Sequence, residues 1–114
     1  MHKTLFRMIW IAAGAGLALT TTVAAADPPE FNLTIRNHRF EPAELTVPAG
    51  QKVKLKVVNA DATPEEFESY ELNREKVIPG NTTATIYVGP LDPGTYPFFG
   101  EFNARTAQGK LVVK

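Results

Sequence analysis

The chain has 114 residues, with 12 lysines and arginines against 12 aspartates and glutamates, so its formal net charge is zero. It contains no cysteine, which excludes disulfide bonds and every site that needs a thiolate. This length supports one folded domain with one core, and the absence of excess positive charge argues against binding to nucleic acids.

The first 26 residues have the pattern of a cleavable signal peptide. Lys3 and Arg7 precede an apolar run from Met8 to Leu19, and Ala24-Ala25-Ala26 supplies the small residues of a cleavage site. Cleavage there leaves residues 27–114 with a net charge near −2, and in a Gram-negative bacterium the address is the periplasm. The alternative is an uncleaved membrane anchor, which the three threonines after the apolar run disfavour. We therefore expect the mature domain not to span a membrane.

The mature part of the chain has the pattern of a β-sandwich. Turn signals recur about every ten residues, with alternating apolar and polar segments between them. The clearest example is Val53, Leu55 and Val57, which alternate with three lysines, so that one face is buried and the other is solvated. No stretch has convincing helical periodicity. We predict an all-β Greek-key sandwich of about eight strands, at residues 31–35, 45–47, 53–57, 67–72, 77–78, 82–88, 96–102 and 111–113.

Alternating strand directions predict which loops meet. The connections after the first, third and seventh strands fall at one end of such a sandwich. They carry His38, residues 61–66 and residues 101–105. We therefore expect the acidic loops and the only histidine of the mature domain to converge.

Several short motifs resemble those of a known family. The chain is similar to the cupredoxins over nearly all of residues 31–114, through Phe40-Glu41-Pro42, Val47-Pro48-Ala49-Gly50, Asn59-Ala60-Asp61 and Gly94-Thr95-Tyr96-Pro97-Phe98. Three further segments resemble the small periplasmic cupredoxin-like component of bacterial ferrous-iron uptake systems, namely residues 64–69 (PEEFES), 71–76 (ELNREK) and 98–102 (FFGEF). The resemblance implies binding or oxidation of Fe(II), beside a periplasmic iron-binding protein and an iron permease.

The resemblance also implies positions for copper ligands, and this chain lacks the ligands. Copper electron-transfer sites need a thiolate, two imidazoles and normally a thioether. The usual first histidine falls on Glu65, and the usual cysteine falls on Gly100, next to Glu101. Residues 103–109 contain neither the second histidine nor the methionine, and Asn103 stands where the iron-uptake subgroup has a histidine. We expect no type-1 copper site.

The glutamates at this end form a candidate metal site. Glu66 and Glu68 share one face of a strand, with Cα atoms roughly 6.5–7 Å apart, and Glu65 adjoins them. Glu101 can join from a neighbouring strand, and His38 from the first connection. Carboxylates with at most one imidazole suit Fe(II), Fe(III), Mn(II), Ca(II) or Mg(II), and the resemblance alone selects iron. Anionic oxygen ligands stabilise Fe(III) more than Fe(II), which favours oxidation and leaves a ferroxidase activity open.

Other interpretations stay open. The glutamates can form a solvated strand face, and His38 can be a simple exposed histidine. Glu71 and Glu75 are expected to pair with Arg74 and Lys76 on the surface. The domain can then be a metal-free interaction module that docks on a transporter or periplasmic partner, its glutamates steering the encounter. A copper-binding protein that uses His38 and carboxylates is the third possibility.

Overall fold

The computed structural model describes residue 16 and residues 26–114, so the predicted signal peptide lies almost wholly outside the described residues. The described part is all-β, as predicted, and none of its helices is long and apolar enough to cross a membrane. The elements in chain order are β1 (Glu30–Arg36), β2 (Arg39–Glu41), β3 (Glu44–Val47), β4 (Val53–Asn59), β5 (Glu65–Ser69), β6 (Arg74–Ile78), β7 (Thr83–Val88), β8 (Gly94–Gly100), the 3-10 helix η1 (Glu101–Asn103) and β9 (Gln108–Val113).

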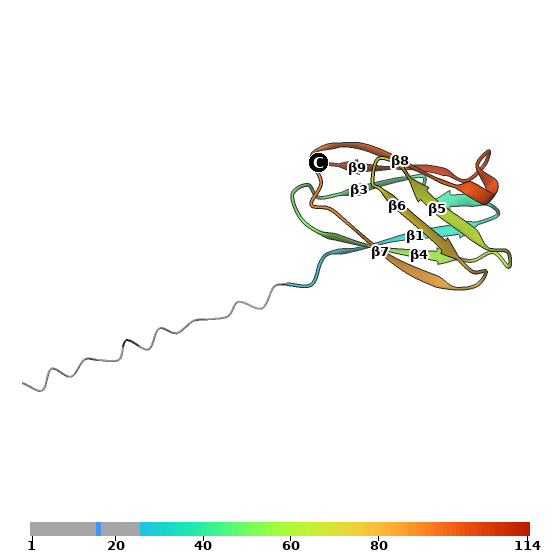
Figure 1. The fold of residues 1–114 in the computed structure, drawn as a ribbon, viewed down its shortest axis with the longest axis horizontal. Helices are drawn as coiled ribbons and strands as arrows, with labels where there is room; N and C mark the ends of the chain where they lie inside the picture. Colours follow the sequence, from blue (N-terminus) through green and yellow to red (C-terminus); the bar gives the residue numbers. More distant parts are fainter. Residues whose placement is uncertain (1–15, 17–25) are drawn as a thin grey trace, which may run out of the picture.

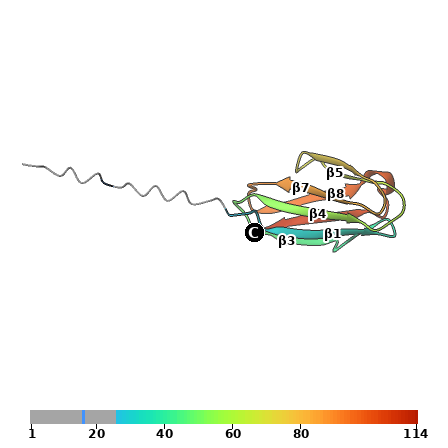
Figure 2. The same ribbon diagram turned by 90° about the horizontal axis from the view of Figure 1, so that it is seen from below.

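The strands form two sheets that pack into a sandwich (Figure 1 and Figure 2). One sheet has the order β2-β1-β4-β7, and the other has the order β3-β9-β8-β5-β6. The pairs β1–β4 and β3–β9 are parallel, and the other pairs are antiparallel. The chain therefore crosses between the sheets, and the predicted Greek-key sandwich is confirmed.

The strand that the sequence did not predict is β2. It ends at Glu41 in one sheet, and the chain then passes through Pro42 and Ala43 into β3 of the other sheet. Proline has no N–H for a strand ladder, so the change of sheet falls where the ladder cannot continue. Only Phe40 of β2 is buried, and one apolar residue is too short a pattern to predict a strand.

The core lies between the sheets and includes three phenylalanine rings that join the two layers. Phe40 belongs to the smaller sheet, whereas Phe67 and Phe98 belong to the larger one. The ring centroids of Phe40 and Phe98 are 4.9 Å apart, edge to face, and those of Phe67 and Phe98 are 5.2 Å apart, stacked. All three side chains are buried, so each ring contributes both apolar area and aromatic contact.

Three connections meet at one end of the sandwich, as expected: the β1–β2 turn, the β4–β5 loop and the segment after β8 (Figure 1). The hydroxyl of Thr106 donates a hydrogen bond to the carbonyl of His38, at 2.6 Å. At the opposite end, the Gly50 N–H donates to the carbonyl of Leu91, at 2.9 Å. The predicted convergence of the loops that carry His38 and the acidic residues is therefore confirmed.

Candidate metal centre

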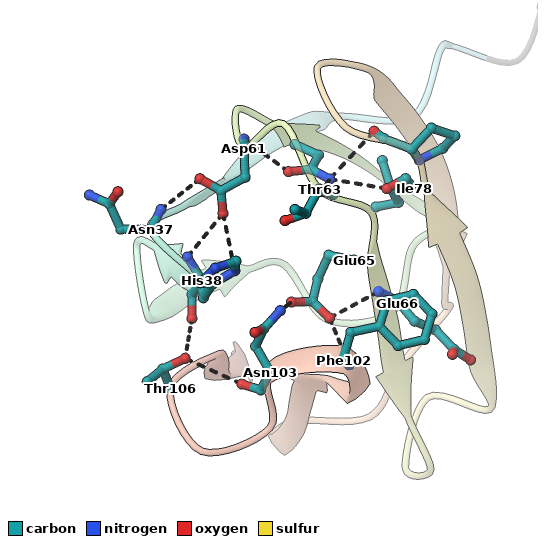
Figure 3. Close-up of polar contacts among 12 residues, drawn as sticks. Asn37, His38, Asp61, Thr63, Glu65, Glu66, Ile78, Phe102, Asn103 and Thr106 are labelled. Atoms are coloured by element: carbon teal, nitrogen blue, oxygen red, sulfur yellow. Dashed lines mark hydrogen bonds and ion pairs between the residues drawn. The ribbon is translucent and has the colours of Figure 1, made fainter.

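Asp61 holds the turn that carries His38. Asn37 and His38 have φ angles of 53° and 57°, the left-handed conformation of the common two-residue hairpin turn. The carboxylate of Asp61 accepts the backbone N–H of Asn37 at 2.8 Å and that of His38 at 2.9 Å (Figure 3). Both hydrogen bonds lower the pKa of Asp61, and the one from His38 has the larger effect. The imidazole Nδ1 of His38 lies 3.6 Å from Asp61 Oδ2, so the histidine belongs to this turn.

Glu65 is the most buried of the predicted site residues, with 1% of its surface exposed. Its Oε1 accepts the backbone N–H groups of Glu66 at 3.0 Å and Phe102 at 2.9 Å. Its Oε2 accepts the side-chain amide of Asn103 at 2.6 Å, a contact visible in Figure 3. Glu65 therefore ties β5 to η1 across the end of the sandwich.

Gly100 provides the space for the Glu65 carboxyl group. A Cβ atom at position 100 would lie 2.6 Å from Glu65 Cδ and 2.7 Å from the Cβ of Ala107. Both distances are shorter than real Cβ contacts, so a side chain at this position would collide with its neighbours. Gly100 stands where the resemblance puts a copper-binding cysteine, and Glu65 stands where it puts the first histidine. The carboxyl group of Glu65 therefore fills the space that a cysteine side chain at position 100 would need.

Glu66, Glu68 and Glu101 come together on the other face of the sheet. Successive residues of a strand point to opposite faces, so Glu66 and Glu68 point away from the Glu65 side of β5 (Figure 3 shows Glu66). Glu101 is the first residue of η1. One oxygen of each carboxylate lies within 4.8 Å of the others. The structure brings together three of the five residues that the sequence suggested, and His38 and Glu65 are outside this group.

Glu75 is a fourth acidic residue at this place, and the sequence reasoning did not include it. It lies in β6 directly opposite Glu68 of β5, and it raises the pKa of the neighbouring Glu66. The predicted surface ion pairs of Glu71 and Glu75 with Arg74 and Lys76 are wrong, because the described residues include no such pair. Arg74 instead donates its Nε to the carbonyl of Tyr87, at 2.9 Å.

Crowding of like charges changes the acidity of this group. The hydrogen bond with Glu75, together with burial and the charge of Glu101, raises the pKa of Glu66 to about 7. Burial, followed by the charges of Glu75 and Glu101, raises the pKa of Glu68. The Oε2 atom of Glu68 is buried and has no hydrogen-bond partner. The ionised group therefore has unmet charge and an unmet acceptor, and a bound cation would satisfy both.

Comparison with known proteins shows what kind of domain this is. Residues 8–113 match the family model of the cupredoxin-like domain. An uncharacterized protein of Rickettsia prowazekii (strain Madrid E) is 44% identical over 84 residues, which are 74% of this chain and 67% of that protein.

Two solved structures have a similar fold. Auracyanin A, a blue copper protein of Chloroflexus aurantiacus, is 20% identical with a TM-score of 0.66, over 76% of this chain and 99% of that one. The metal-binding domain of the Cu(I)-exporting ATPase CopA of Streptococcus pneumoniae is 15% identical with a TM-score of 0.67, and the match covers 75% of this chain and 84% of that one. At these identities the likeness concerns the fold alone.

Proposed function

The chain belongs to the family of cupredoxin-like domains, and on that premise we propose that it binds Fe(II) through Glu66, Glu68 and Glu101 in bacterial iron uptake. The observation that carries the proposal is the group of three carboxylates within 4.8 Å, in which Glu68 Oε2 is buried and unpartnered. Carboxylate oxygens are the preferred ligands of hard and borderline cations. A divalent ion among them would neutralise charge that the described part of the protein leaves unbalanced.

Type-1 copper, the ion suggested by the fold, does not fit this chain. There is no cysteine to supply a thiolate, and His38 is the only histidine after the predicted signal peptide. The position of the missing cysteine, Gly100, has no room for a side chain. A copper site made from His38 would have Asp61 beside it, whose carboxylate already accepts two backbone hydrogen bonds. Oxygen-ligated iron is therefore the better proposal.

Iron is selected over other oxygen-seeking ions by the resemblance of the PEEFES and GEF segments to the iron-uptake component. In this proposal Fe(II) is the cargo, and the signal peptide over residues 1–26 directs the protein to the periplasm. There it would act beside a periplasmic iron-binding protein and an iron permease. Because anionic ligands favour Fe(III), the site would also make oxidation of the bound ion easier.

A protein-interaction module is the second candidate function. Large apolar side chains are exposed near the acidic group: Phe102 follows Glu101, and Val77 lies opposite Glu66 in the ladder. Tyr70, in the β5–β6 turn, is 74% exposed. Exposed aromatic residues beside charged ones are typical of docking surfaces. Under this alternative the glutamates steer a partner, and metal binding is negligible.

Anaerobic calorimetric titration of the purified protein with Fe(II) tests the proposal. We expect saturable binding in the wild type and at least a tenfold weaker affinity, about 1.4 kcal/mol, in the Glu66→Gln/Glu101→Gln variant. Glu71→Gln is the matched control, because Glu71 is exposed and outside the group, and it should bind as the wild type does. Unchanged binding in the double variant would exclude the proposed ligands. Negligible uptake by the wild type would favour the interaction module.

A further inference from the structure

Four carboxylates share the outer face of the sheet at β5: Glu66 and Glu68 of β5, Glu75 of β6, and Glu101 of η1. The strand order β8-β5-β6 places Glu66 and Glu68 in the middle. Glu101, which follows β8, lies on one side, and Glu75 of β6 lies on the other. Glu75 faces Glu68 in the ladder. A central pair of carboxylates therefore has one further carboxylate on each flank.

The Glu75 flank has a pocket of its own. Its volume is about 160 Å³, and it is lined by Glu68, Ser69, Tyr70, Asn73, Arg74 and Glu75. Glu66 and Glu101 do not line it, so the pocket is distinct from the space among the three carboxylates. Each molecule in liquid water takes up about 30 Å³, so the pocket has room for an ion with several water ligands. Glu68, with its unpartnered buried oxygen, belongs to both places.

The charge on this face favours a second cation beside the first. Across residues 26–114, no lysine or arginine nitrogen forms an ion pair with any of the four glutamates. Arg74 lines the pocket and contributes one positive charge there, and its Nε and Nη1 donate to the carbonyls of Tyr87 and Asn73. When all four carboxylates are ionised, Arg74 and one divalent ion together compensate three of the four negative charges, and the remaining negative charge favours a second cation.

We propose that this face binds two divalent cations as a carboxylate-bridged pair. The first ion is held by Glu66, Glu68 and Glu101, and the second is held in the pocket by Glu68 and Glu75, with water completing its ligands. A carboxylate has two oxygens, so Glu68 can bind one ion with each, and ions in two-metal sites lie about 3.5–4 Å apart. The proposal rests on the proposed metal-binding function and adds a second, weaker site to it.

Counting bound Mn(II) by equilibrium dialysis, with electron paramagnetic resonance of the same samples, tests the second site. We expect two ions per chain and an exchange-coupled signal in the wild type. Glu75→Gln should bind one ion, with the coupled signal lost. Glu75 is exposed, so this variant should fold, and circular dichroism checks that it does. Glu71→Gln, in the same hairpin, should behave as the wild type.

The outcomes separate this proposal from the one on which it rests. One ion per chain in the wild type, or two ions still bound by Glu75→Gln, would overturn the second site and leave the first intact. Two ions without a coupled signal would show separate sites and overturn the bridge through Glu68. No bound Mn(II) and no bound Fe(II) would overturn both proposals together.

Discussion

Glu65 and Glu66 are neighbours in the chain and have opposite environments. Glu65 points to the inner side of β5, where two backbone N–H groups and the amide of Asn103 bind its carboxylate. Glu66 points to the outer side, among carboxylates that repel it. Because the side chains of a strand alternate, one run of acidic residues supplies both a structural tie and a candidate ligand set. A count of glutamates therefore says little until each is assigned to a face.

The Glu65–Asn103 contact can be tested by exchanging its donor and its acceptor. In Glu65→Gln, the amide oxygen can keep both backbone bonds, but the amide nitrogen faces that of Asn103. We expect a loss of roughly 1.5–3 kcal/mol in the free energy of unfolding, measured with urea. The Glu65→Gln/Asn103→Asp variant restores a donor–acceptor pair and keeps the net charge, so it should recover most of the loss. Failure to recover would show that the contact contributes little.

The β5–β6 hairpin is the element that carries most of the four clustered glutamates. It carries Glu66, Glu68 and Glu75, and the four-residue turn over residues 70–73 sets Glu68 opposite Glu75. Only Glu101 comes from elsewhere, and the Glu65 tie to Phe102 fixes η1, in which Glu101 lies. The candidate ligand set is thus largely local in sequence, and its geometry depends on the register of β5 with β6 and on the Glu65–Phe102 hydrogen bond.

The metal-free protein should become less stable as the pH rises from 4.5 towards 7. The pKa of Glu66 is about 7 in the folded protein and 4.5 as the ordinary value. Between these values the folded state holds more protons than the unfolded state, so raising the pH favours unfolding. Urea denaturation at several pH values, with a chelator present, measures the trend. Glu66→Gln has no such proton, so its loss of stability should be smaller, and an equal loss would contradict the assignment.

The hairpin also shows where the sequence was insufficient. The alternation of apolar residues and lysines in β4 predicted that strand, and the turn signals recurring along the chain predicted the sandwich. The strand predicted over residues 67–72 was too long at its C-terminal end. It included part of the β5–β6 turn over residues 70–73, because Tyr70 and Leu72 are apolar. That error hid the register, and with it the place of Glu75. The sequence also could not predict where the His38 side chain points, because its position depends on contacts with Asp61, which lies 23 residues further along the chain.

In the whole molecule, the sheet face that carries Glu66 and Glu68 lies over a core in which three phenylalanine rings join the two sheets. Phe67 is fully buried and lies in β5 between Glu66 and Glu68, on the opposite face of the strand. Its ring stacks on Phe98 and meets the edge of Phe40 from the other sheet. Packing of the two sheets therefore fixes the strand that presents the acidic groups.

Phe67→Ala should cost about 3–5 kcal/mol in the free energy of unfolding, because it leaves a cavity between the sheets. Domains of this size are stable by about 5–15 kcal/mol, so the variant should be marginally folded. Phe67→Leu fills more of the space and should lose less. Thermal and urea denaturation of both variants measure the difference. A loss below about 1 kcal/mol for the alanine variant would contradict the central place of this ring.

The volume conflict at Gly100 sets what would be needed to build a copper site in this protein. A cysteine there and the buried carboxyl group of Glu65 are mutually exclusive occupants of one volume. Gly100→Cys alone would place its side chain against Glu65 and Ala107, and a type-1 copper site would also need Glu65 replaced and the missing imidazole and thioether ligands supplied.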